Sequence, residues 1–350
     1  MTPARRAILR VSLSITALLG VMLTSLGLFL LSSFADAQSG PTKTNVVKCF
    51  VSILPQEFFV SRIGGSHVTT DVLVGPGQEP HTFELTPRAM TSLAQADLFF
   101  SIGLPFEQVI IKKLARMPHK VRIIDTTTGV PFLKLQSDHE HHHHDTESHG
   151  DTKHGHAGKA RERNPEEKSD HSHDNNGQHA SGRDPHIWLD PKLVKIQATN
   201  IAQALIAADP AHADYYKDNL IKFERELDDL DATLAADLAP YKGQKFFVYH
   251  PAFGYFAARY GLVQVPVEVE GKEPTAKHIA DLVKSAKENG IRIIFVEPQF
   301  SRKSAEIIAK AIGGSVVVVD PLNRDYINGM RAIGSTITKS MQSTLNNSGK

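Results

Sequence analysis

Two stretches of the chain, one near each end, alternate short apolar runs with segments of helix-forming composition. The runs are rich in Val, Ile and Phe and cover residues 46–53, 68–74, 97–102, 121–124, 245–249, 264–268, 291–296 and 315–319. Apolar runs of this length between helical segments are typical of βαβ units, whose parallel strands are buried on both faces. The sequence therefore predicts an α/β protein of two lobes, each with a mostly parallel sheet flanked by helices.

A single long helix is expected between these two stretches. Asp209-Pro210 begins it, because proline is favoured in the first turn, and Pro240 ends it. At 1.5 Å per residue it is about 45 Å long and could support both lobes, whereas an ordinary surface helix of one lobe is the alternative. Its apolar face consists of Tyr216, Leu220, Phe223, Leu227, Leu230 and Leu234. The expected organisation is an N-terminal lobe at 45–208, a linking helix at 209–240 and a C-terminal lobe at 241–345.

Residues 1–37 have the pattern of an export signal. Three arginines precede an apolar run over residues 11–31, and the small residues that signal peptidase requires lie at Ala35 and Ala37. We expect cleavage after Ala37 and a periplasmic mature protein. Because the apolar run is longer than a usual signal core, an uncleaved membrane anchor is the alternative.

Charge balance and cysteine content exclude several classes of function. The chain has 39 basic and 38 acidic residues and a formal net charge of +1, so it lacks the basic field that nucleic acid or an anionic membrane requires. Cys49 is the only cysteine, which excludes an intrachain disulfide and a metal site built from thiolates. It lies in an expected strand, where a buried side chain is the simplest interpretation.

Residues 136–183 contain 11 of the 18 histidines, many acidic residues and almost no apolar ones. Such a composition cannot form a core, so we expect a disordered His-rich loop that collects divalent ions loosely, with a solvated spacer as the alternative. The stretch from His139 to His143 matches the H-E-x-x-H pattern of zinc proteases. That chemistry requires a packed helix, and nothing apolar follows the match, so we reject a protease site.

Three histidines and one aspartate lie where an expected strand has just ended. They are His81, His186, His250 and Asp320. In parallel α/β sheets, ligands bind outside the carboxyl ends of the strands. Three imidazole nitrogens and one carboxylate oxygen form a four-coordinate set suited to Zn²⁺, at about 2.0–2.2 Å from each ligand. A filled tetrahedron leaves no position for water, which favours binding and release over hydrolysis.

Other polar residues near the strand ends offer alternatives. Glu79, Glu268 or Glu297, or a water molecule, could replace Asp320 as the fourth ligand. Taken alone, each histidine could equally be a capping or surface group. The remaining histidines outside the loop lie in expected turns or on helix surfaces and are interpreted as structural: His67, His119, His212 and His278.

The segments around the three histidines resemble signature segments of the zinc and manganese substrate-binding proteins of ABC transporters, the cluster A-I family. They are Pro80-His81-x-Phe83-Glu84-x-Thr86-Pro87, Asp184-Pro185-His186-x-Trp188-Leu189-Asp190-Pro191 and His250-Pro251-Ala252-Phe253. The resemblance spans residues 45–340 and implies two lobes of four-stranded parallel sheet joined by one long helix. It also implies that the ion lies in the cleft between the lobes, bound by His81, His186, His250 and Asp320.

A histidine at the third ligand position and a His-rich loop before the second segment resemble the zinc-uptake branch of this family. Manganese members usually carry a carboxylate at the third position, and harder oxygen ligands suit Mn²⁺ better than imidazoles do. We therefore expect Zn²⁺ as the transported ion, with Mn²⁺ as the alternative. One departure is that many zinc members carry a disulfide in the C-terminal lobe, which a chain with one cysteine cannot form.

The resemblance implies partner proteins. The sequence contains no G-x-x-x-x-G-K-[ST] loop and no set of membrane spans, so a permease and an ATPase of an ABC transporter would supply passage and energy. We expect a monomeric substrate-binding component and not an enzyme. The rival interpretations are a metal-buffering surface adhesin of the same fold and an exported zinc hydrolase, which would need an open coordination position and a general base.

Overall fold

The computed structural model describes residues 46–133, 183–268 and 272–348. The expected export signal at 1–37 and the expected His-rich loop at 136–183 therefore lie outside the described residues, apart from Arg183. Within the described ranges, no helix is both long and apolar enough to cross a membrane. The described residues from Val47 onward belong to one compact unit.

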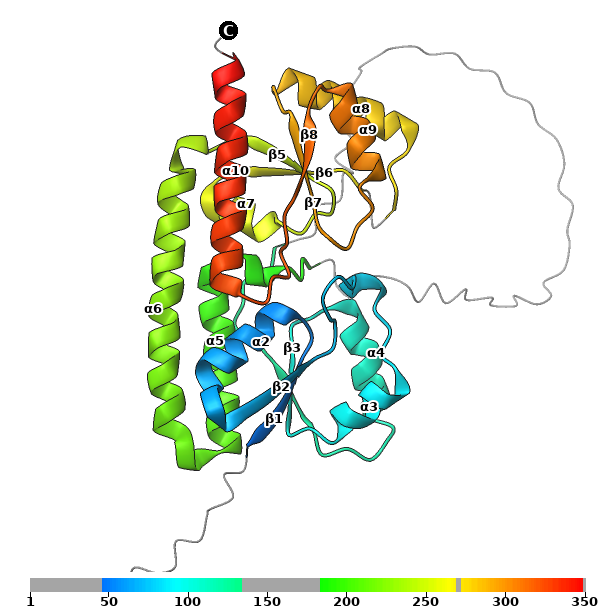
Figure 1. The fold of residues 1–350 in the computed structure, drawn as a ribbon. Coiled ribbons are helices and arrows are strands. Elements are labelled where there is room, and N and C mark those ends of the chain that lie inside the picture. The colour runs from blue at the N-terminus through cyan, green and yellow to red at the C-terminus, as the bar shows by residue number, and fades with distance from the viewer. Residues whose placement is uncertain (1–45, 134–182, 269–271, 349–350) are drawn as a thin grey trace, which may run out of the picture. The chain divides into compact units, whose positions relative to one another are not determined.

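Two parallel sheets of four strands form the centres of the two lobes (Figure 1). The first contains β1 (Val47–Val51), β2 (Val68–Val72), β3 (Leu98–Ser101) and β4 (Arg122–Asp125), in the order β2-β1-β3-β4. The second contains β5 (Lys245–Val248), β6 (Val263–Pro266), β7 (Ile293–Val296) and β8 (Ser315–Val318), in the order β6-β5-β7-β8. Every described pair of neighbouring strands is parallel. The prediction of two α/β lobes with mostly parallel sheets is confirmed.

The inner strands are mostly apolar because both faces of each sheet are covered by helices. All four residues of β3 are buried. In β1, Cys49 is 1% exposed, and burial together with the nearby charge of Asp97 raises the pKa of its thiol to about 12. Its expected role as a buried strand residue is confirmed, and at neutral pH it is an unreactive thiol.

The helices that flank the sheets begin at the capping residues that the sequence provides. Thr86 Oγ1 accepts a hydrogen bond from the backbone nitrogen of Ala89, and Thr275 Oγ1 accepts one from that of His278. The helices around the first sheet are α2 (Leu54–Gly64), α3 (Pro87–Ala94), α4 (Pro105–Leu114) and α5 (Pro191–Ala208). Those that follow β5 are α7 (Gly254–Tyr260), α8 (Ala276–Glu288), α9 (Lys303–Ala311) and α10 (Tyr326–Ser348).

The expected linking helix is α6 (Ala213–Leu238), preceded by the 3₁₀ helix η5 (Pro210–His212) and followed by η6 (Ala239–Tyr241). It packs against α2, α5 and α10. The apolar face predicted from the sequence is the buried face, except that Leu220 is only half-buried. This burial explains why a helix with so many charged residues is held in place along its length.

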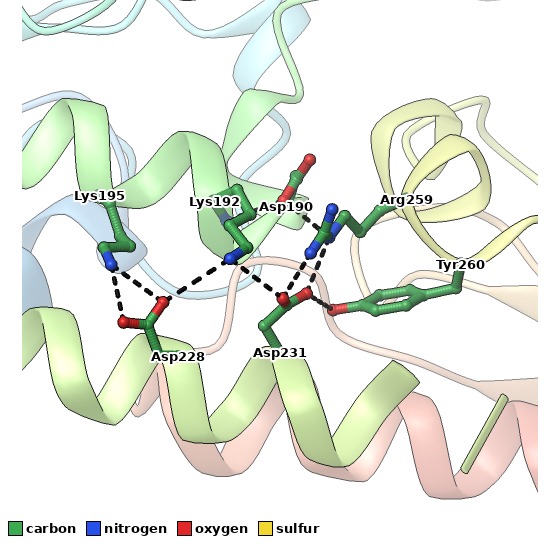
Figure 2. Close-up of polar contacts among 7 residues, drawn as sticks. All are labelled: Asp190, Lys192, Lys195, Asp228, Asp231, Arg259 and Tyr260. Carbon is green, nitrogen blue, oxygen red and sulfur yellow. Dashed lines mark hydrogen bonds and ion pairs between the residues drawn. The ribbon is translucent and has the colours of Figure 1, made fainter. Parts of the chain in front are cut away.

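A network of charged side chains connects α6 to α7, the first helix of the C-terminal lobe (Figure 2). Arg259 of α7 donates from Nε to Oδ1 of Asp231 at 2.8 Å, and Tyr260 donates its hydroxyl to the same oxygen. Although burial opposes ionisation, the hydrogen bonds and charge of Arg259 hold the pKa of Asp231 below its usual value. Lys192 and Lys195 of α5 continue the network to Asp228. A two-nitrogen contact between guanidinium and carboxylate is specific in orientation, so it fixes α7 on α6.

The last helix, α10, returns to the N-terminal lobe after β8. Gly334 allows α10 to approach α6 closely, since a Cβ at that position would lie 2.3 Å from Cδ2 of Leu234. Tyr326 packs edge-on against Phe59 of α2, with ring centroids 5.0 Å apart, and donates its hydroxyl to the backbone oxygen of Trp188. The final helix therefore connects the two lobes a second time.

Candidate metal centre

His186 lies in the segment that leads into α5, and the preceding aspartate fixes its conformation. Asp184 Oδ1 accepts from the backbone nitrogen of His186 at 2.9 Å and lies 2.7 Å from its ring Nδ1. An aspartate that bonds the backbone two residues later forms a common local turn. The ring is 3% exposed and lies beside Trp188, whose Nε1 donates to the backbone oxygen of Pro321, after β8.

His250 lies two residues after the end of β5. Its ring Nδ1 lies 2.6 Å from Oε1 of Glu268, which follows β6. Its ring also stacks on Phe300, with centroids 5.0 Å apart. The side chain is almost fully buried, and its rotation is therefore limited from two sides.

His81 lies in the 3₁₀ helix η2 (Pro80–Thr82), in the loop that follows β2. Glu79 caps this turn, because its two carboxylate oxygens accept from the backbone nitrogens of His81 at 2.7 Å and of Thr82 at 2.6 Å. The ring centroid of His81 is 4.9 Å from that of His250 and 5.6 Å from that of His186. His81 also lines a surface cavity of about 450 Å³, together with other residues of η2 and residues of α4.

The three rings converge on one point. One nitrogen from each of His81, His186 and His250 lies within 4.8 Å of the other two. The Nε2 atoms of His186 and His250 are 3.2 Å apart. Two nitrogens that bind one tetrahedral zinc ion lie about 3.3 Å apart, given bonds of about 2.0 Å.

The carboxylates behind two of these rings define which nitrogen faces the centre. A carboxylate only accepts hydrogen bonds, so Nδ1 carries the hydrogen in both rings and, in the neutral tautomer, Nε2 presents a lone pair. Two lone pairs at 3.2 Å repel unless a proton or a metal ion lies between them. The third nitrogen, from His81, makes a metal ion the better match for this position.

The structure does not bring Asp320 into this group. Among the described residues, the set of mutually close ligand atoms around the centre contains the three histidines alone. Asp320 Oδ1 accepts from the backbone nitrogen of Leu322 at 2.9 Å, and burial raises the pKa of the carboxyl group. Oε2 of Glu297 accepts a hydrogen bond from the backbone nitrogen of His250 at 3.4 Å, and burial raises the pKa of Glu297 to about 7. The fourth position is therefore not filled by a described side chain in this arrangement.

Sequence reasoning missed the role of Asp184 and assigned Glu268 only as an alternative ligand. Both are positioned behind the histidines, as partners of Nδ1. Of the histidines interpreted as structural, His119 bonds the backbone oxygen of Val121 through Nδ1, whereas His67 and His212 lie together beside Asp209.

Known proteins share the fold and about a third of the aligned residues. The chain matches the family model of the zinc-uptake complex component A, periplasmic (ZnuA), over residues 49–340. It is 31% identical over 278 residues to the zinc-binding protein AdcA of Streptococcus pyogenes, a match that covers 79% of this chain and 50% of AdcA. The chain thus spans about half the length of that relative. It is 29% identical over 295 residues to the high-affinity zinc uptake system protein ZnuA of Bacillus subtilis, covering 83% of this chain and 82% of that protein.

A solved structure gives the same result in three dimensions. A crystal structure of ZnuA matches with a TM-score of 0.70 and 36% sequence identity, covering 84% of this chain and 99% of that one. The resemblance inferred from the histidine segments is confirmed, because the family model and the relative from Bacillus subtilis both describe components of zinc uptake systems. The match over most of its length shows that this chain belongs to the ZnuA family, the periplasmic component A of zinc-uptake complexes.

Proposed function

We propose that the protein is the extracytoplasmic substrate-binding component of a zinc ABC transporter, and that it captures Zn²⁺ between its lobes and delivers it to a membrane permease. The observation that carries this proposal is the convergence of His81, His186 and His250, with two of the rings oriented by carboxylates. Carboxylate partners of ligand histidines fix the tautomer and raise the basicity of the other nitrogen. The histidines are thus arranged as metal ligands.

The ligand set favours Zn²⁺ over Mn²⁺. Three imidazoles form a borderline-soft set, whereas Mn²⁺ prefers carboxylate and carbonyl oxygens. The fourth ligand is either water or Asp320, and Asp320 would first have to release the backbone nitrogen of Leu322. Asp184 and Glu268 are occupied as partners of the histidines and are positioning residues, not ligands.

Delivery requires that the set can be loosened. His81 and His186 are positioned by elements of the N-terminal lobe, and His250 by β5 of the C-terminal lobe. A small displacement of one lobe at the permease would separate His250 from the other two and release the ion. We assign passage and energy to a permease and an ATPase, and we place the mature protein in the periplasm as a monomer after removal of residues 1–37.

Competition with a chromogenic chelator tests this proposal on the full chain. We expect one tight Zn²⁺ site that His81→Ala abolishes and that His119→Ala, a control histidine far from the centre in sequence, leaves intact. The chelator is chosen to register only tight binding, so that loose binding by other histidines does not contribute. Tight Mn²⁺ binding in the same assay would show that Zn²⁺ is not the preferred ion. Tight Zn²⁺ binding by His81→Ala would show that the ion binds elsewhere.

A further inference from the structure

A second group of metal-ligand side chains lies at the opposite edge of the N-terminal sheet. His67 ends the 3₁₀ helix η1 (Gly65–His67) directly before β2, whereas His81 and His250 lie in the loops that follow β2 and β5. Asp209 and His212 lie in the connection between α5 and α6. One ligand atom from each of the three residues lies within 4.8 Å of the other two. Because the strands are parallel, the residue before β2 lies at the amino edge, away from the carboxyl edge that carries the metal centre.

The three side chains are in direct contact with one another. The rings of His67 and His212 stack with centroids 3.7 Å apart and an interplanar angle of 26°. Oδ2 of Asp209 lies 2.6 Å from Nδ1 of His212 and accepts a hydrogen bond from the hydroxyl of Tyr216 at 2.7 Å. All three residues are half-buried, so they are positioned by the fold and remain accessible to an ion.

The backbone that carries His67 is fixed against the start of α6. Gly65 has a φ of 51°, and a Cβ there would lie 2.1 Å from the hydroxyl oxygen of Tyr215, so only glycine fits. Asn219 Nδ2 donates to the backbone oxygen of Ile63 at 3.1 Å. The η1 turn and the start of α6 therefore form a rigid frame, and ligands on rigid elements lose little entropy when they bind an ion.

We propose that His67, Asp209 and His212 form an accessory site for a divalent transition-metal ion of the Zn²⁺ type. Two imidazoles and a carboxylate suit such ions, and partial exposure leaves a position for water. The ion would take the place of the proton between Oδ2 of Asp209 and Nδ1 of His212, so that both atoms become ligands and the proton is released. A bound ion would connect the α2–β2 junction to the α5–α6 junction and so stabilise the N-terminal lobe.

Thermal unfolding separates this site from histidines that bind metal equally well in the folded and the unfolded chain. Histidines that are close in sequence can still bind metal in the unfolded chain, and such binding does not raise the unfolding temperature. His67 and His212 are brought together only by the fold. In a full-length His81→Ala background, we expect Zn²⁺ to raise the unfolding temperature by a few degrees, and we expect His67→Ala to abolish this rise. His119→Ala in the same background is the control and should keep it.

Diffraction on the unmodified protein provides a test that does not depend on any variant. Crystals soaked in Zn²⁺ should show anomalous scattering between His67 and His212. The proposal is overturned by the absence of this peak, or by a zinc-dependent rise that His67→Ala leaves unchanged. Failure of the proposed function looks different, because it would remove the peak among His81, His186 and His250 and leave the accessory peak in place.

Discussion

Replacing Asp184 with asparagine tests whether the carboxylate behind His186 contributes to metal affinity. Asparagine keeps the shape and one acceptor oxygen, so the 2.9 Å bond from the backbone nitrogen of His186 and the 2.7 Å contact to its Nδ1 can both persist. The negative charge, which makes Nε2 a stronger ligand, is lost. Removal of such a partner typically lowers metal affinity roughly 10- to 100-fold, which corresponds to about 1.4–2.8 kcal/mol. We expect the dissociation constant for Zn²⁺ to rise by this factor.

The assay compares Asp184→Asn with a matched variant of the same local turn. Asp125 Oδ1 also accepts from the backbone nitrogen two residues later, that of Thr127, at 2.9 Å, but Asp125 has no histidine partner among the described contacts. Both proteins are titrated with Zn²⁺ against a chelator at pH 7.5, and the unfolding temperature of each is measured without metal. Only Asp184→Asn should lose affinity.

Three results would refute this reasoning. If Asp184→Asn binds Zn²⁺ within about threefold of the unmodified protein, the carboxylate does not tune the ligand, since the expected loss is at least about tenfold. If Asp125→Asn loses as much affinity, the effect is a general one on the fold. If the unfolding temperature without metal falls for Asp184→Asn alone, Asp184 stabilises the fold of its loop and does not act on the ligand His186.

Three further outcomes are expected. Asp231→Asn should lower the free energy of unfolding by about 1–3 kcal/mol, since it removes hydrogen bonds to a charged group. Because the pKa of Asp231 in the folded protein lies below 3.8, its contribution to stability is complete above pH 3.8 and is lost as the pH falls below that value. The urea unfolding curves of the variant and the unmodified protein should therefore converge in acid. Leu230→Ala, at a fully buried position of α6, should cost about 2–5 kcal/mol in the same urea assay, and a loss below that range would mean that the face is not a packed core. Zn²⁺ affinity should fall between pH 7.5 and pH 5, because protons compete for imidazole nitrogens, and an unchanged affinity would rule out a set of three histidines.

The strands and their flanking caps could be predicted because their signals are local. A strand buried on both faces is mostly apolar, as β3 is, and a threonine before a helix caps it wherever the helix packs. The return of α10 to α6 is a different case. It depends on Gly334 meeting Leu234, a contact between residues far apart in the chain that no sequence pattern specifies.

The candidate metal centre was also predictable only where its signals are local. The expectation that a strand ends just before each histidine holds for His250, which follows β5, but not for His186, which lies in the segment before α5. Asp184 gives a local signal, two residues before its histidine. Glu268 gives none, because its place beside His250 depends on the pairing of β5 with β6. The grouping of His67 with His212 escaped sequence reasoning for the same reason, since each lies in an ordinary turn.

The connections between the lobes limit how the ion can be released. Arg259 holds α7 to α6, Tyr326 of α10 bonds the backbone of Trp188, and the indole of Trp188 bonds the backbone of Pro321. A wide opening of the lobes would break all three contacts. A wide opening is also unnecessary, because metal–ligand distances tolerate changes of only about 0.2 Å. A displacement of about 1 Å between His250 and the other two rings would therefore disrupt the set, and we infer that a permease needs only to move the loop that carries His250.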